Sequence, residues 1–157
     1  MPSDIAAPPL QTPLIEGPNQ PYITKVWYGW LRSIITRVQD SAQAVASVPL
    51  TGQSAGVGLT PLIVAAAAGL YRVSYWFRVT TPATVSSSLQ VAVTTTEGGV
   101  VVTQTGPAYT GNLTTEPQSG NFVVNPDGGT PVSYEVLYGS VGATAMEYDA
   151  SIVLDQL

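Results

Sequence analysis

The chain has 157 residues, of which 45% are hydrophobic but only 10% are charged, and its net charge is −5. It contains only five lysines and arginines, too few to follow a phosphate backbone, so nucleic acid is excluded as an expected partner. It also contains no cysteine and no histidine, which excludes disulfides, Cys/His zinc sites and the familiar Ser-His-Asp and Cys-His catalytic systems. We therefore expect a protein that is not an enzyme and uses no metal or cofactor.

The N-terminus has neither the basic start nor the uninterrupted apolar run of a secretory signal. The longest stretch of low polarity, Leu62 to Leu70, is too short to cross a bilayer. These observations predict a protein that is made in the cytoplasm, with no export signal and no membrane as partner.

Residues 1–21 are rich in proline, which forbids a helix and favours an extended, polyproline-like arm. Apolar side chains are spaced along this arm at Ile5, Leu10, Leu14 and Ile15. A pure spacer would be polar, whereas an extended arm with spaced apolar residues can dock into grooves on a partner or on its own oligomer. We take these four residues as a candidate anchor, and the alternative is an unattached terminus.

Residues 22–46 form the one convincing helix, because they lack proline and their apolar residues follow a helical spacing. A heptad-like seam runs through Trp27, Leu31, Ile34, Val38, Ser41 and Val45. A single amphipathic helix packed on its own sheet would show much the same spacing. Two further aromatic residues, Tyr28 and Trp30, favour a bundle of several copies, since one small sheet does not readily bury so much aromatic surface.

Residues 47–157 alternate short β-like runs with turn signals, the pattern of a sandwich or barrel. The expected strands are Val48–Thr51, Leu59–Val64, Leu70–Thr80, Ser88–Thr96, Val100–Thr105, Asn121–Val124, Val132–Tyr138 and Glu147–Leu154. Eight short strands suit a two-sheet jelly roll. Between them we expect a tight hairpin at Glu97–Gly99, a turn at Asn125–Pro131 and a long exposed loop at residues 106–120.

The expected strand Leu70–Thr80 is the one around which this domain is organised. Its apolar and aromatic residues recur at every second position and share one face: Tyr71, Val73, Tyr75, Phe77 and Val79. That face must lie over a hydrophobic core, because leaving such side chains in water costs roughly 1.5–3 kcal/mol each. The opposite face carries Trp76 between two arginines. It is either ordinary surface with one exposed ring or a surface that meets another subunit.

The proline-rich arm, the aromatic-rich helix and a β domain containing Gly69-Leu-Tyr-Arg-Val-Ser-Tyr75 resemble a small trimeric virion protein of tailed bacteriophages, of the head-fibre, decoration or tail-fibre kind. The segments Ala67–Tyr75 and Pro131–Tyr138 also resemble the TNF/C1q-like trimeric jelly rolls. The chain departs from the tumour-necrosis and complement members in having no cysteine, signal sequence or collagen stalk, which leaves the phage resemblance.

This resemblance implies a mainly β protein with a jelly roll of about eight strands, preceded by an extended arm and one helix, and assembled as a homotrimer. By position, it implies that a helix bundle is lined by Trp27, Leu31, Ile34 and Val38. It also makes Trp76 a candidate for the intersubunit face. The implied partners are further copies of the chain and capsid or tail proteins of the same virion, which would be the protein's location.

Two classes of function remain open. The first is a structural or attachment protein of a virion, and the alternative is a carbohydrate- or receptor-binding module of a tail fibre that recognises a host-surface glycan through exposed aromatic residues. The N-terminus favours the first, since a free-standing lectin needs no apolar arm and no tryptophan-rich helix. Same-face carboxylates at Glu147, Asp149 and Asp155 could bind calcium or hydrolyse glycosides, but such an arrangement is most often the solvated face of a strand.

Overall fold

The structure is a computed structural model that describes residues 25–39 and 43–157. The chain divides into two compact units, Met1–Gln43 and Ala44–Leu157. In the first unit, α1 spans Lys25–Gln39. These fifteen residues contain no proline, and their apolar residues recur at helical spacing, as an amphipathic helix requires.

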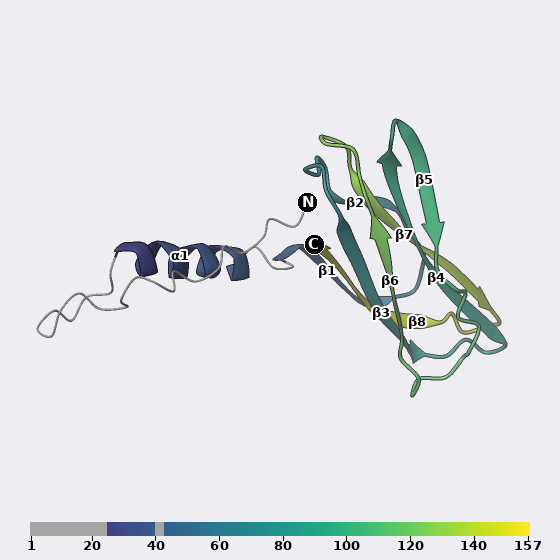
Figure 1. The fold of residues 1–157 in the computed structure, drawn as a ribbon. Helices are drawn as coiled ribbons and strands as arrows, with labels where there is room; N and C mark the ends of the chain where they lie inside the picture. The colour runs from purple at the N-terminus through teal and green to yellow at the C-terminus, as the bar shows by residue number, and fades with distance from the viewer. Residues whose placement is uncertain (1–24, 40–42) are drawn as a thin grey trace, which may run out of the picture. The chain divides into compact units, whose positions relative to one another are not determined.

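The second unit is a sandwich of two four-stranded sheets, with the orders β1-β8-β3-β6 and β2-β7-β4-β5 (Figure 1). The strands are β1 Gln43–Gln53, β2 Val57–Ile63, β3 Tyr71–Thr81, β4 Ser86–Glu97, β5 Val100–Thr105, β6 Gln118–Val124, β7 Val132–Val141 and β8 Glu147–Gln156. The prediction of a mainly β fold with eight strands is confirmed. Every connection except the β4–β5 hairpin crosses from one sheet to the other, an arrangement that agrees with a jelly roll.

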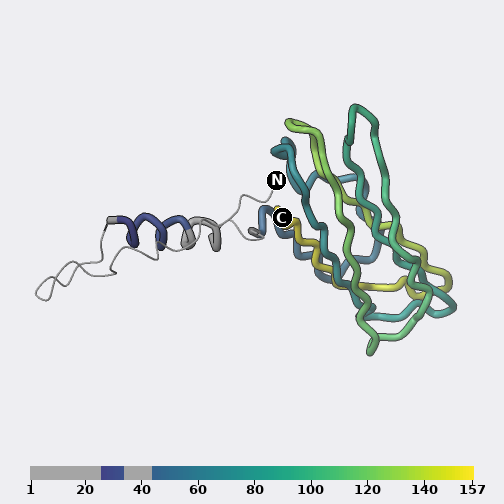
Figure 2. The backbone as a smooth tube through the Cα atoms, in the orientation of Figure 1, coloured from purple at the N-terminus to yellow at the C-terminus, as the bar shows by residue number. Residues whose placement is uncertain are grey.

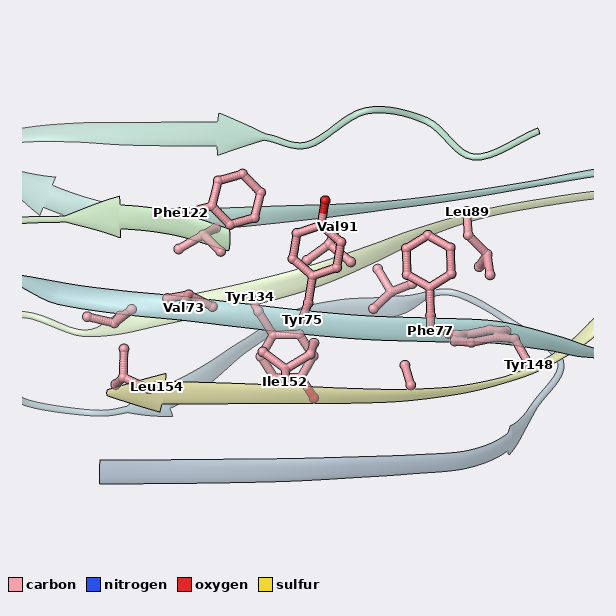
Figure 3. Close-up of a cluster of buried hydrophobic side chains, with 14 of the residues drawn as sticks. Val73, Tyr75, Phe77, Leu89, Val91, Phe122, Tyr134, Tyr148, Ile152 and Leu154 are labelled. Atoms are coloured by element: carbon pink, nitrogen blue, oxygen red, sulfur yellow. The ribbon is translucent and has the colours of Figure 1, made fainter. Parts of the chain in front are cut away.

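The core lies between the two sheets, and β3 is its central strand. Tyr71, Val73, Tyr75, Phe77 and Val79 are each at most 6% exposed, as the period-two alternation predicts. Figure 3 shows three of these side chains in a row on β3, next to those of β8 and facing those of β4. The hydrophobic face of this one strand therefore fixes which side of its sheet is inside.

The two ends of the sandwich carry different loops. At one end, the loop at 64–70 bonds the loop at 125–131, where the N–H of Ala66 donates to the carbonyl of Thr130 at 2.8 Å (Figure 2). At the other end lies the loop at 106–117. Gly52 near the end of β1 bonds Asp149 near the start of β8, so the two neighbouring strands run in opposite directions. The first residues of β1 therefore lie beside the last residues of β8. The chain therefore enters the domain at the first end, here called the entry end, and the other is the far end.

The predicted boundary between helix and first strand is wrong. The helix ends at Gln39 and β1 already begins at Gln43, so the expected helical extension to residue 46 is part of a strand. Within β1, Ala46, Val48 and Leu50 are partly buried against the core while the residues between them are exposed. This period of two belongs to a strand on a sheet, and Val45, placed in the helical seam by sequence, lies on the exposed face of that strand.

The far-end loop is shorter and better anchored than the sequence predicts. It ends at residue 117, because β6 begins at Gln118. Tyr109 exchanges two backbone hydrogen bonds with Leu89, at 2.8 and 2.9 Å. The side-chain oxygen of Asn112 accepts hydrogen bonds from the N–H of Ala83 and the hydroxyl of Ser87, both at 2.9 Å. The longest continuously exposed part of the predicted loop is therefore its tip, residues 113–117.

Candidate interaction surface

The predicted helical seam is only partly described by the structure. Trp27 and Leu31 are partly buried, and the ring of Trp27 meets that of Trp30 edge to face, with their centroids 5.4 Å apart. Ile34 and Val38 lie on helical backbone, but their side chains are outside the described residues. The edge-to-face pair stabilises the first turns of α1 by about 0.5–1.5 kcal/mol.

The candidate anchor residues Ile5, Leu10, Leu14 and Ile15 all lie outside the described residues, as does Ser41 of the seam. Within α1, the side chains of Val26 and Tyr28 are 52% and 60% exposed. The helix therefore presents apolar and aromatic surface in addition to its tryptophan pair.

Trp76 lies on the outer face of β3, where the sequence places it. Its side chain is 37% exposed, and the guanidinium of Arg78 lies over its ring at 5.8 Å, within the range of a cation–π interaction. The Cα partners of Trp76 on the neighbouring strands are Ser119 of β6 and Ser151 of β8. An exposed tryptophan flanked by small hydroxyl side chains leaves its ring edge accessible to a flat partner surface.

The arginines beside this tryptophan are paired across strands with carboxylates of β8. Arg72 contacts Asp155 with 2.9 Å between Nη2 and Oδ2, and Arg78 contacts Asp149 with 3.2 Å between the same atoms. Asp149 also accepts a hydrogen bond from the backbone N–H of Gly52 at 2.9 Å. These donors, the Gly52 N–H first and the Arg78 guanidinium second, hold the pKa of the Asp149 carboxyl below its usual range.

The three carboxylates that share one face of β8, which the sequence analysis considered as a calcium or glycosidase site, all have partners within the chain. Glu147 accepts a hydrogen bond from the hydroxyl of Thr81 at 3.0 Å, and Asp149 and Asp155 are held by arginines. No group of three or more His, Cys, Asp or Glu side chains in residues 25–39 and 43–157 is placed to hold a metal ion. The outer face of this sheet therefore carries charges that are paired within the chain, together with the exposed Trp76.

Asp127 has a role that the sequence did not reveal. Its two carboxylate oxygens accept hydrogen bonds from the backbone N–H groups of Gly98 and Gly99, at 2.9 and 2.7 Å. Both glycines have positive φ, 59° and 78°, as the tight β4–β5 turn requires. The 125–131 loop is thus bonded to the tip of the β4–β5 hairpin. The sequence predicts a turn in both segments but not the contact between them.

A small pocket lies between the far-end loop and the β3–β6 edge. It encloses about 290 Å³ of space, part of it open to solvent, and is lined by Tyr75, Phe77, Pro107, Ala108, Tyr109, Gln118 and Ser119. Among the described residues, the hydroxyl of Tyr109 is buried without a hydrogen-bond partner in the structure. The lining of the pocket offers a ligand the side-chain amide of Gln118 and the hydroxyl of Ser119.

None of the helices in the described part of the chain is long and apolar enough to cross a membrane. A scan of the chain against models of known protein families finds no match, and a search of curated proteins finds none either.

Proposed function

We propose that the chain is a non-enzymatic structural protein of a bacteriophage virion, a homotrimeric fibre or decoration protein that its N-terminal arm attaches to the particle. The observation that carries the proposal is the outer face of the β1-β8-β3-β6 sheet. There an exposed Trp76 stands among arginines whose charges are neutralised within the chain. Such a face can meet another subunit without leaving an unpaired charge buried, which would cost several kcal/mol.

Attachment depends on assembly in this mechanism. An extended arm that presents Ile5, Leu10, Leu14 and Ile15 buries roughly 400–600 Å² against a groove, the size of a weak contact. Several arms joined through one oligomer act at high effective concentration, so that their combined affinity exceeds that of one arm by roughly 10²–10⁴. The helix joins the copies and holds the arms together.

The positions of the loops agree with attachment through the N-terminus. The chain enters the sandwich at the entry end, whereas the exposed tip of the 106–117 loop lies at the far end. A domain anchored through its N-terminus has its far end free to meet other molecules.

The alternative, a carbohydrate- or receptor-binding module of a tail fibre, is supported by the pocket beside this loop. The aromatic rings, Gln118 and Ser119 that line it are the side-chain types that bind a neutral sugar. The two functions are compatible, since a fibre can carry a binding site at its free end.

Particles that lack the protein provide the test. Changing Leu10, Leu14 and Ile15 to serine should leave the oligomer intact and abolish binding to these particles. Changing Leu31 and Ile34 to aspartate should weaken the oligomer and attachment together. The matched control is Leu113→Ser, which removes an exposed leucine from the far end and leaves occupancy unchanged.

Wild-type occupancy by the arm variant would show that the arm is not the anchor. Imaging of purified particles with an antibody against the β domain decides between capsid and tail, and an absence of label from the particles excludes the virion proposal.

A further inference from the structure

A hollow at the far end lies between the start of β4, the end of β7 and the 106–117 loop. It encloses about 460 Å³ of space, part of it open to solvent, and no charged residue lines it. Its lining consists of five hydroxyl residues, one glycine and one valine: Ser86, Ser87, Ser88, Thr110, Ser140, Gly139 and Val141. The hollow is therefore polar without carrying a charge.

Gly139 makes room for this hollow. It is the Cα partner of Ser88, and a Cβ atom added to it would lie 2.5 Å from the Ser88 hydroxyl oxygen. Its φ is not positive, so glycine is required here for space and not for backbone conformation. Leu137 and Val141, which share its face of β7, are 43% and 55% exposed. The glycine thus leaves a gap between two exposed apolar side chains.

The hydroxyls that line the hollow fall into two groups. Ser87 Oγ donates to Asn112 Oδ1, and Ser140 Oγ accepts from the backbone N–H of Met146, both at 2.9 Å. The other three hydroxyls make no hydrogen bond with any residue that the structure describes: those of Ser86, Ser88 and Thr110. These three are therefore available to a ligand.

The backbone that carries these three hydroxyls is held in place. On one side, β4 pairs with β7 in an unbroken register. On the other side, Thr110 follows Tyr109, whose backbone exchanges two hydrogen bonds with Leu89, so Thr110 lies next to Ser88. Groups that are already fixed lose less conformational freedom when a ligand binds.

We propose that this hollow binds a neutral sugar residue of a glycan. Serine and threonine hydroxyls both donate and accept hydrogen bonds, as the hydroxyls of a sugar do. The exposed side chains of Leu137 and Val141 provide apolar contacts for the C–H groups of the sugar ring. A charged ligand would find no ion-pair partner in the lining, and the net charge of −5 would repel an anion.

The inference rests on the alternative function above in its ligand class, and it adds a second site for that ligand. Tyr109 lines the pocket described before, whereas Thr110, the next residue, lines this hollow. The two sites can therefore be blocked one at a time.

An array of neutral and anionic glycans tests the inference with the full chain. We expect the wild type to bind neutral glycans. Thr110→Trp, which fills the hollow, should reduce this signal at least tenfold, and Leu113→Trp on the exposed loop tip should leave it unchanged. Ala108→Trp blocks the other pocket. Loss of signal in Ala108→Trp but not in Thr110→Trp would place the sugar in that pocket and overturn the inference.

A pair of smaller changes at the same residue gives the second measurement. Thr110→Val removes the hydroxyl and keeps the shape of the side chain, whereas Thr110→Ser keeps the hydroxyl. With the array glycan that binds best as the probe, calorimetry should show roughly threefold to tenfold weaker binding for Thr110→Val and nearly unchanged binding for Thr110→Ser. Equal affinity of both variants and the wild type would show that this hydroxyl does not contact the sugar.

Attachment to particles is measured separately on the same variants. All of them should occupy particles that lack the protein as the wild type does, because the hollow lies at the far end. A wild type that binds no glycan, or only anionic glycans, overturns this inference and leaves the proposed attachment standing. A wild type that binds neutral glycans through the hollow but is absent from particles overturns the attachment alone.

Discussion

Tyr75 shows how one side chain dictates the residues on two other segments. A Cβ atom added to Gly106 would lie 2.6 Å from the Tyr75 hydroxyl. A Cβ atom added to Gly120, which is the Cα partner of Tyr75 on β6, would overlap the tyrosine ring. Both positions therefore require glycine for space, not for backbone conformation, since neither has a positive φ. The sequence offers no sign of this, because glycine is expected at turns for other reasons.

Gly106→Ala should therefore destabilise the domain by about 1–3 kcal/mol, because the added methyl group overpacks the site. In a Tyr75→Phe background the same change should cost less than about 1 kcal/mol, since the remaining neighbours of the methyl group lie 3.3 Å away or more. Urea denaturation of the two single variants and the double variant measures this coupling. Gly58→Ala, where no atom lies within 4 Å, is the control. Additive costs would refute the contact.

Asp149 makes stability depend on pH. Its pKa in the folded chain is lowered by the Gly52 N–H and by Arg78, so it stabilises the fold above the ordinary aspartate pKa of about 4. That contribution is lost as the pH falls through the lowered value. The urea midpoints of the wild type and of Asp149→Asn should therefore differ at pH 7 and converge once the pH has fallen below the lowered pKa of Asp149. A difference that stays constant over this range would show that the carboxylate charge is not responsible.

The strands were predictable because each is a short run whose apolar residues alternate. The β5 bounds, Val100–Thr105, are the same in sequence and structure, since a Gly-Gly turn on one side and the glycine at 106 on the other delimit the run. The long strands β4 and β7 extend beyond their predicted ends, β4 into Ser86, Ser87 and Glu97 and β7 into Gly139, Ser140 and Val141. These residues show no alternation of apolar and polar side chains, and they are strand because their neighbours offer backbone hydrogen bonds.

The start of β1 was mispredicted for a related reason. Residues 43–46 read Gln-Ala-Val-Ala, which fits a helix and a strand equally well at the level of local propensity. What decides the structure is the unpaired edge of β8, beside which this segment adds as a strand. Contacts of this kind join residues about 100 positions apart, and no local pattern encodes them.

The candidate surface was predictable in part. The period of two placed Trp76 on the outer face of β3, and its exposure agrees with that placement. The pairing of Arg72 and Arg78 with β8 depends on register, which two strands so distant in sequence do not reveal.

At the scale of the whole molecule, the division at Gln43 predicts which part folds by itself. The core consists of residues from Ala66 to Leu154, with Ala46, Val48 and Leu50 of β1 packed against it. Residues 44–157 should therefore give a β-rich circular dichroism spectrum and a cooperative thermal transition.

A chain that starts at residue 54 lacks β1 and the Gly52 hydrogen bond to Asp149, and it exposes the edge of β8. It should unfold at least 10 °C lower or aggregate. Equal melting temperatures for the two truncated chains would show that β1 is dispensable. The mass of the 44–157 chain is informative as well: an oligomer that survives without the helix must be held by the sandwich, and the outer face of the β1-β8-β3-β6 sheet with its exposed Trp76 is the candidate contact.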